Sequence, residues 1–386
     1  MTKKLGLVLT AAASLALAAC GGGGGSDPEP SSGILRAAIT DAPSCGYDAV
    51  HVTVQRLRVH ASATAGDSDG GWSELVLSPA RRLDLLTLSN GVLEELGQLP
   101  LPAGRYTQLR LVLASNDASN PLANAVTPSG GASTALETPS GQQSGIKLNA
   151  NIDVEAGKVA DVVLDFDACK SVVPRGNSGR YNLKPVVSVL PRLSDAGARV
   201  VGYVEASLAN SATRVSVQQA GVPIKSTWPD ANGRFVLYPL PAGNYDLVLG
   251  ASGRVNAVMT GVPVVATTPT EVNSAALPIS LPASAERDVT GTLTPASATL
   301  RALQTLGTTT VEVAWAPVLA DTGAFALRLP IAAPLKLAYV PNPTALNFVP
   351  DTLAAAKYKL EANSGGVLKT VDLDVSAPVA PIVIGF

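Results

Sequence analysis

Three aspartates near the middle of the chain have a spacing that could bind a metal ion. Asp161, Asp165 and Asp167 have the same parity in an apolar stretch, so a strand would place them on one face. Like charges this close repel unless they are solvated or bridged, and carboxylate oxygens suit Ca²⁺, with Asp41 or Asp48 as a possible further ligand. The alternative, which we favour, is a solvated outer face of a sheet, and it predicts no metal and no cofactor.

The nucleophiles and imidazoles of the chain lack the partners that catalysis requires. Ser144 and Lys147 have the spacing of a Ser-x-x-Lys motif, but that chemistry needs a helix and two further motifs, Ser-Asp-Asn and Lys-Thr-Gly. The sequence contains neither motif, and the segment has the pattern of a loop that enters a strand. His51 and His60 would lie on opposite faces of a strand. We therefore expect no catalytic residue, no zinc site and no enzyme activity.

Residues 1–19 predict a cleaved leader that ends in a lipid anchor. The uncharged apolar run within them is shorter than the roughly 20 residues of a membrane-spanning helix and fits a signal peptide. Leu17-Ala18-Ala19-Cys20 resembles the lipobox of bacterial lipoproteins, which implies that the Cys20 thiol receives a diacylglycerol and that cleavage precedes it. Such acyl chains attach a protein to a membrane. An ordinary signal peptide before an accidental cysteine is the alternative.

The residues after this cysteine predict a flexible tether and the cellular localisation of the protein. Residues 20–32 are rich in Gly, Ser and Pro and would form a flexible spacer between the membrane and the fold. Gly21 resembles the pattern that directs lipoproteins of Gram-negative bacteria to the outer membrane. We expect the protein to be lipid-anchored there, facing either the periplasm or the cell surface.

Composition argues against nucleic acid as a partner and indicates several domains. The chain of 386 residues has 28 basic and 30 acidic side chains, a net charge of −2, and loss of the leader removes two lysines and makes it −4. Nucleic acids and anionic lipid surfaces instead require basic patches. The length exceeds what one core accommodates, and short apolar runs between Gly and Pro are typical of all-β domains. We expect tandem small β-sandwiches.

Two cysteines remain once Cys20 carries lipid. Cys45 and Cys169 would lie in an oxidising compartment, where they most simply form one disulfide. A bond that closes so long a loop could contribute up to about 4–5 kcal/mol in the chain-entropy model. Two separate buried thiols are the alternative.

The first expected domain covers residues 33–193. A change of parity after Val54 predicts a β-bulge, and the Ser/Gly/Pro-rich stretch 114–144 predicts an irregular surface loop. Six motifs follow one another in order: Ile39–Pro43, Asp84–Leu86 with Asn90–Gly91, Leu101–Tyr106, Ser144–Leu148, Leu164–Asp167 and Tyr181–Val186. Together they closely resemble a domain-of-unknown-function family that follows the lipobox in many proteobacterial lipoproteins. The resemblance implies an exported β-sandwich-like domain and supplies no activity.

Two further domains are expected behind the first. Residues 198–282 contain Asp-Ala-Asn-Gly-Arg-Phe at 230–235 and Leu-Pro-Ala-Gly-Asn-Tyr at 240–245. This order resembles the carboxypeptidase-regulatory-like, prealbumin-like β-sandwich, which implies that the Phe and the Tyr pack between two sheets. A weaker repeat of the same pattern predicts a third β-sandwich over residues 288–386.

These features favour a non-enzymatic lipoprotein of the cell envelope whose sandwiches bind or scaffold an envelope protein or glycan. A carbohydrate-binding surface module is the first alternative, because such platforms expose aromatic rings. Each expected domain carries one tryptophan, Trp72, Trp228 or Trp315, and two of them exposed in one groove would support this alternative. A hydrolase with a site assembled from distant loops is the second alternative.

Overall fold

The computed structural model describes residues 31–41, 46–139, 141–176, 178–192 and 197–386. The predicted signal peptide, the predicted lipid attachment residue Cys20 and the predicted disulfide partner Cys45 lie outside the described residues. Within them the secondary structure is almost entirely β-strand, which confirms the all-β fold class with tandem sandwiches. In this part of the chain, no helix has the length and apolar character needed to cross a membrane.

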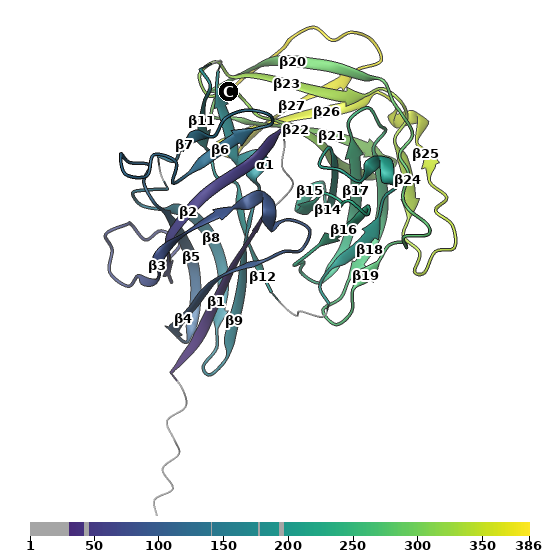
Figure 1. The fold of residues 1–386 in the computed structure, drawn as a ribbon. Helices are drawn as coiled ribbons and strands as arrows, with labels where there is room; N and C mark the ends of the chain where they lie inside the picture. Colours follow the sequence, from purple (N-terminus) through teal and green to yellow (C-terminus); the bar gives the residue numbers. More distant parts are fainter. Residues whose placement is uncertain (1–30, 42–45, 140, 177, 193–196) are drawn as a thin grey trace, which may run out of the picture.

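The first domain packs two sheets around one core (Figure 1). The smaller sheet has the order β12-β9-β1-β4, and its two central strands run parallel. The larger sheet has the order β10-β11-β7-β6-β2-β5-β8, with β3 paired to β2. The strands are β1 Ser32–Asp41, β2 Tyr47–His60, β3 Ser73–Asp84, β4 Glu94–Pro102, β5 Gly104–Leu113, β6 Ala125–Pro128, β7 Thr134–Glu137, β8 Ile146–Val154, β9 Val159–Phe166, β10 Val172–Arg175, β11 Arg180–Leu183 and β12 Val187–Pro191. Two short helical turns complete the domain, η1 Leu85–Leu88 and α1 Ala168–Ser171.

The strands of the first domain follow the alternation in their sequences. Leu164 and Phe166 on β9 are fully buried in the core, and a buried side chain of this size contributes about 1.5–3 kcal/mol. The pairing of β2 with β3 and with β5 shifts register between Val54 and Arg56. This shift confirms the predicted bulge, which turns the second half of the strand so that its apolar side chains still face the core.

The prediction of an irregular loop over residues 114–144 is wrong in part. The chain forms β6 and β7 here, and both join the larger sheet. Asn124 is fully buried beside them, where its side chain accepts from the Thr53 N–H at 2.9 Å and donates to the Ala114 carbonyl at 2.7 Å. A buried amide must be satisfied in this way, and these bonds fix the segment against β2.

The second domain places a small sheet, β16-β13-β19, against the larger sheet β15-β14-β17-β18. Phe235 is fully buried between them and Tyr245 is nearly so, as the resemblance implies. The larger sheet continues into β24 and β25, which come from within residues 288–386, and β24 runs parallel to β18. The strands are β13 Val200–Tyr203, β14 Thr213–Gln219, β15 Val222–Thr227, β16 Arg234–Leu237, β17 Gly243–Ala251, β18 Ala257–Val264, β19 Thr270–Glu271, β24 Leu335–Ala338 and β25 Val349–Pro350, with the turn η2 Ala206–Leu208.

The third domain repeats the two-layer plan. Its sheets have the orders β23-β20-β28 and β22-β21-β26-β27. The core of the third domain also takes in Val248 and Val258 from β17 and β18 of the second domain, so the two sandwiches pack against each other, although each keeps its own core. The strands are β20 Glu286–Thr294, β21 Thr299–Leu306, β22 Thr309–Ala316, β23 Ala324–Pro330, β26 Lys357–Ser364, β27 Val367–Asp374 and β28 Ile382–Gly385, with the turn η3 Thr352–Ala354.

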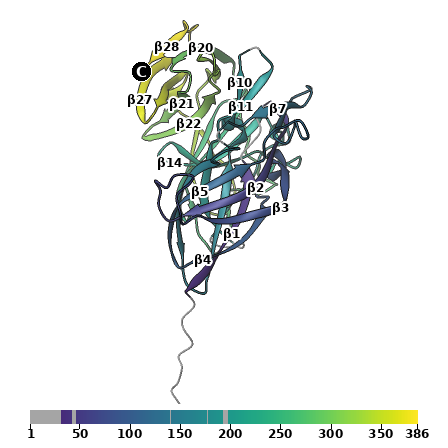
Figure 2. The same ribbon diagram turned by 90° about the vertical axis from the view of Figure 1, so that its left-hand side faces the viewer.

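The three sandwiches touch one another. In Figure 1 the first and second domains lie side by side, and the third lies across the top of both. Figure 2 shows the same arrangement from the side, with β20, β27 and β28 above β1 to β5. Trp228 of the second domain packs against the core of the first. The place where the three domains meet is therefore enclosed by side chains from distant parts of the sequence.

Candidate functional site

A single glutamate lies where the three domains meet. The Glu312 side chain on β22 is 3 % exposed, and its Oε1 accepts from the Lys170 Nζ at 2.7 Å. Arg214 Nη1 lies 3.5 Å from Oε1, and Arg301 Nη1 lies 3.6 Å from Oε2. Lys170 belongs to the first domain, Arg214 to the second and Arg301 to the third. One buried carboxylate therefore lies within ion-pair distance of three cations, one from each domain.

Neighbouring hydrogen bonds hold this glutamate in position. The Glu312 N–H donates to Gln218 Oε1 at 2.8 Å, and Gln218 Nε2 donates to the Glu312 carbonyl at 2.7 Å. The Gln218 side chain is fully buried and pairs with the backbone of β22 as a neighbouring peptide group would. Arg301 also donates to the Gly221 carbonyl at 2.8 Å. These bonds join the second and third domains around the ion cluster.

A cavity of about 550 Å³ opens beside the Glu312 cluster. Its volume falls within the range of ordinary small-molecule sites, about 300–1,000 Å³. All three domains contribute to its wall, and most of the wall is apolar. The lining residues are Lys170, Val173, Lys184, Pro185, Val186, Val222, Ala298, Thr299, Leu300, Arg301, Glu312, Trp315, Ala316, Pro317, Val318, Glu361 and Asn363.

The charged groups of the cavity are unevenly paired. Arg301 Nη2 lies 2.7 Å from Glu361 Oε1, so both cavity carboxylates bind cations that lie within the wall. Lys184 donates to the Ser297 carbonyl, and no carboxylate of the described residues lies within ion-pair distance of it. Desolvation by the surrounding protein lowers the pKa of this lysine. The cavity therefore has an unmatched positive charge.

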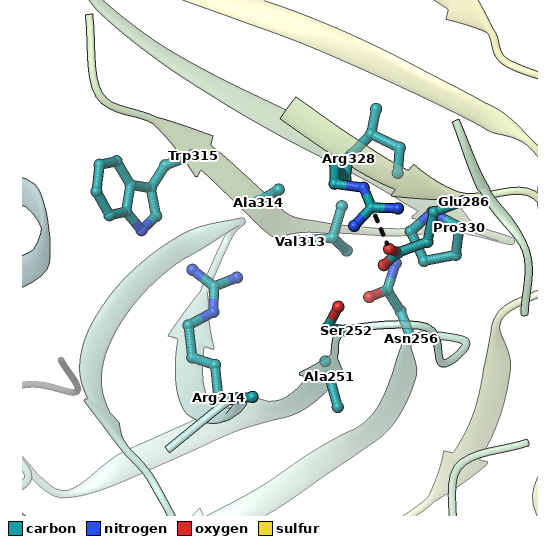
Figure 3. A pocket seen from close by; sticks show the side chains of 13 residues that line it. Arg214, Ala251, Ser252, Asn256, Glu286, Val313, Ala314, Trp315, Arg328 and Pro330 are labelled. Atoms are coloured by element: carbon teal, nitrogen blue, oxygen red, sulfur yellow. Dashed lines mark ion pairs between the residues drawn. The ribbon is translucent and has the colours of Figure 1, made fainter. Parts of the chain in front are cut away.

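A smaller cavity of about 260 Å³ lies between the second and third domains (Figure 3). Trp315 lines both cavities. In Figure 3 the Arg214 guanidinium points toward Trp315, while Arg328 and Glu286 of the neighbouring strands β23 and β20 form an ion pair on one side of the cavity, with Nε 3.6 Å from Oε2. Because this pair is already matched, the smaller cavity has less need of a charged ligand.

A second buried ion pair joins the first two domains. Lys225 of β15 forms an ion pair with Asp165 of β9, and its Nζ donates to the Asp41 carbonyl at 3.3 Å. Desolvation raises the pKa of Asp165 and holds the pKa of the Asp41 carboxyl well above its usual range. Asp41 Oδ1 accepts from the Ala168 N–H at 2.9 Å, while Oδ2 has no partner among the described residues. The two domains thus meet over polar groups removed from water.

The structure gives the three predicted aspartates separate roles. Arg36 Nη2 donates to Asp161 Oδ2 at 2.7 Å, Asp165 binds Lys225, and Asp167 caps α1 by accepting from the backbone N–H of residue 170 at 3.0 Å. Asp161 and Asp165 share the outer face of β9, and Asp167 lies beyond its end. Where the chain is described, no three His, Cys, Asp or Glu side chains are grouped as metal ligands. Sequence alternation therefore did not bring these carboxylates onto one ion.

Other candidates from the sequence are also dispersed. Ser144 lies in a turn and Lys147 follows on β8, with no helix to bring them together. Cys169 is buried in α1 and is disulfide-bonded. Because Cys45 lies outside the described residues, the Cys45–Cys169 bond stays a prediction, as does lipid attachment at Cys20.

The tryptophans occupy three different environments. Trp72 lies beneath two guanidinium groups, those of Arg58 at 4.5 Å and Arg110 at 4.9 Å from the ring centre. Trp228 packs against the first core, and Trp315 lines the two cavities. All three are half-buried, and over the described ranges no two of them share a groove. This arrangement does not give the aromatic platform that a glycan-binding face would use.

Sequence patterns did not identify the residues at the junction. The cluster combines Lys170, Arg214, Arg301 and Glu312, which lie far apart along the chain. Glu312 alternates with Val311 and Val313, a pattern that places a charge on the solvent-facing side of a strand, so no signal in the sequence indicated that this side chain is buried. A buried charge requires a partner, and only the structure shows which groups supply it.

Comparisons with known proteins identify the first domain only. Residues 32–185 match the family model described as "Domain of unknown function (DUF4382)". No curated protein matches. Two crystal structures of interface mutants of a type II cohesin–X-dockerin complex from Acetivibrio cellulolyticus are similar to part of the chain, at 25% and 23% identity and a TM-score of 0.19. Each similarity covers 23% of this chain and 59% of the other, so the chain spans less than two thirds of those structures. A similarity this weak carries no argument about the protein.

Proposed function

We propose that the protein is a non-enzymatic lipoprotein of the cell envelope that binds an envelope component in the larger junction cavity. The observation that carries this proposal is that all three domains line one cavity of about 550 Å³. A binding site of this kind is expected where domains meet, because their curved surfaces leave a concave space. The sandwiches then act as a scaffold that holds the walls of the site together.

Lipid attachment and localisation at the outer membrane are part of the same proposal. A lipid on Cys20 would hold the chain on the outer membrane, and the tether 20–32 would let the folded domains reach a ligand near that membrane. The buried ion pairs at the junction support a fixed site, since truncating one member of such a pair costs several kcal/mol. A fixed site suits binding because less ordering is needed when the ligand arrives.

Site-specific photo-crosslinking in intact cells tests this function. Val222 lines the cavity and is 48 % exposed, so a photoreactive amino acid placed there should capture the bound component. Val76 on β3 is 62 % exposed and lies outside the cavity, which makes it the matched control. We expect an adduct, seen as added mass on the peptide that contains position 222, and none at position 76. Equal labelling at both positions, or none at either, would contradict the proposal.

A further inference from the structure

Lys184, the lysine of the junction cavity that has no carboxylate partner among the described residues, indicates the charge of the ligand. An ammonium group has three donors, and Lys184 uses one of them on the Ser297 carbonyl. The two cavity carboxylates lie elsewhere, because Glu312 accepts from Lys170 and Glu361 binds Arg301. Lys184 is an exposed residue in the wall of the cavity, and no carboxylate of the described residues lies close enough to give it a matching negative charge. An anionic group of a ligand would supply it.

The remaining wall of the cavity is largely apolar and would match an apolar part of a ligand. Val186 is 39 % exposed and Val222 is 48 % exposed, and both line the cavity together with Val318 and the Trp315 ring. Apolar side chains left uncovered beside a concave site usually mark a surface that a ligand covers. Burial of such surface is favourable by roughly 25 cal/mol per Å².

We infer that the larger junction cavity binds a small amphipathic carboxylate, with its anionic group at Lys184 and its apolar body against Val186, Val318 and Trp315. The inference rests on the proposed binding function and adds the chemical class of the ligand. A single lysine acts as a point charge, so it matches one negative charge, and a carboxylate supplies that charge on a small apolar body. Arg301 is held by Glu361 and by the Gly221 carbonyl, which leaves Lys184 as the group that meets the anion.

Binding of octanoate, octanol and acetate to the full mature chain tests this inference. The chain is prepared with Cys20→Ser so that no detergent is needed, and binding is measured by isothermal titration calorimetry. Octanoate should saturate one site, octanol should bind about tenfold more weakly because it lacks the charge, and acetate should not bind measurably because it lacks the apolar body.

Lys184→Met tests the role of the lysine, because methionine keeps the apolar stem and removes the charge. Octanoate affinity should fall about tenfold, while octanol affinity stays unchanged. Lys158→Met is the matched control, since Lys158 is a 68 % exposed lysine of the first domain that lies outside the cavity and pairs only with Glu155 among the described residues.

The outcomes separate this inference from the proposed function. Octanol that binds as tightly as octanoate, or a Lys184→Met variant that binds octanoate normally, would overturn the anionic class. Absence of octanoate binding would overturn it as well. In each of these cases a position-222 adduct in cells would leave the proposed binding function standing, whereas its absence would remove both.

Discussion

At the scale of single residues, the interface between the first two domains depends on carboxyl groups held away from water. Asp41 is fully buried at the end of β1, and Asp165 is 7 % exposed on β9. Desolvation raises the pKa of both groups. A raised pKa means that the folded state binds a proton more tightly than the unfolded chain does. The stability that these groups contribute is therefore fully present at low pH and is lost as the pH rises.

Asp41→Asn tests this linkage, because asparagine has nearly the same shape and cannot ionise. Its Oδ1 can still accept from the Ala168 N–H, as Asp41 Oδ1 does at 2.9 Å. As the pH rises above about 4, the free energy of unfolding of the unmodified protein should fall relative to that of the variant. Urea unfolding of both proteins from acid to neutral pH measures the difference. A difference that is constant with pH, or that grows in favour of the aspartate, would refute this account.

At the scale of elements, a loop of the first domain forms hydrogen bonds with the edge strand β16 of the second domain. Asn90 follows η1, and its side-chain oxygen accepts from the Val236 N–H on β16. Its backbone N–H donates to Thr227 Oγ1 at 3.0 Å, and its Nδ2 donates to the Arg234 carbonyl at 3.4 Å. The backbone of Asn90 has φ 57°, a left-handed conformation that asparagine tolerates better than most residues. One residue thus satisfies an exposed strand edge and sets the contact between two domains.

Substitutions of Asn90 should separate the contribution of its side-chain hydrogen bonds from that of its left-handed backbone conformation. Asn90→Gly keeps the left-handed backbone but loses both side-chain bonds, so we expect a loss of about 1–3 kcal/mol in unfolding free energy. Asn90→Ala should lose about 1 kcal/mol more, because its Cβ makes φ 57° unfavourable. The control is Asn342→Gly, at an exposed position with φ 50° and no side-chain bond among the described residues. An effect of Asn90→Gly no larger than that of the control would argue against the contact.

At the scale of the whole molecule, Glu312 joins three domains at one point. Its carboxylate binds cations from each of them, and Val248 and Val258 of the second domain pack into the core of the third. The strands β24 and β25 add a further connection, since they leave the third segment to extend the sheet of the second domain. These links predict that the domains unfold together.

Glu312→Gln tests this coupling. The substitution removes the carboxylate that Lys170, Arg214 and Arg301 share, although Arg301 keeps Glu361, so the junction should lose about 3 kcal/mol or more. Calorimetric unfolding should then change from one transition to two, because the third domain separates before the others. Asp288→Asn is the control, since Asp288 pairs with Arg328 at the surface, where both side chains are largely exposed and an ion pair contributes about 0–1 kcal/mol. A single unchanged transition in Glu312→Gln would show that the junction does not couple the domains.

The sequence by itself determined the secondary structure and much of each separate core. The change of parity after Val54 predicted the bulge, and the resemblance to the prealbumin-like sandwich implied the buried positions of Phe235 and Tyr245. These features depend on the alternation of side chains along a strand and on local turn chemistry, which neighbouring residues encode. The strands within residues 114–144 were missed because the segment is held in place by contacts with residues far away in the sequence, such as the bond from the Thr53 N–H to the buried Asn124 side chain.

Only the tertiary structure decided which charged groups meet. Asp161, Asp165 and Asp167 were predicted from their spacing to share one solvated face of a strand, with a shared Ca²⁺ as the alternative, but each has its own partner in the fold. The junction cavity could not be predicted from the chain, because Lys184 and Glu312 line one cavity only when the three domains pack. The pairing of buried charges depends on distances in space, whereas sequence spacing fixes only the face of a strand on which each charge lies.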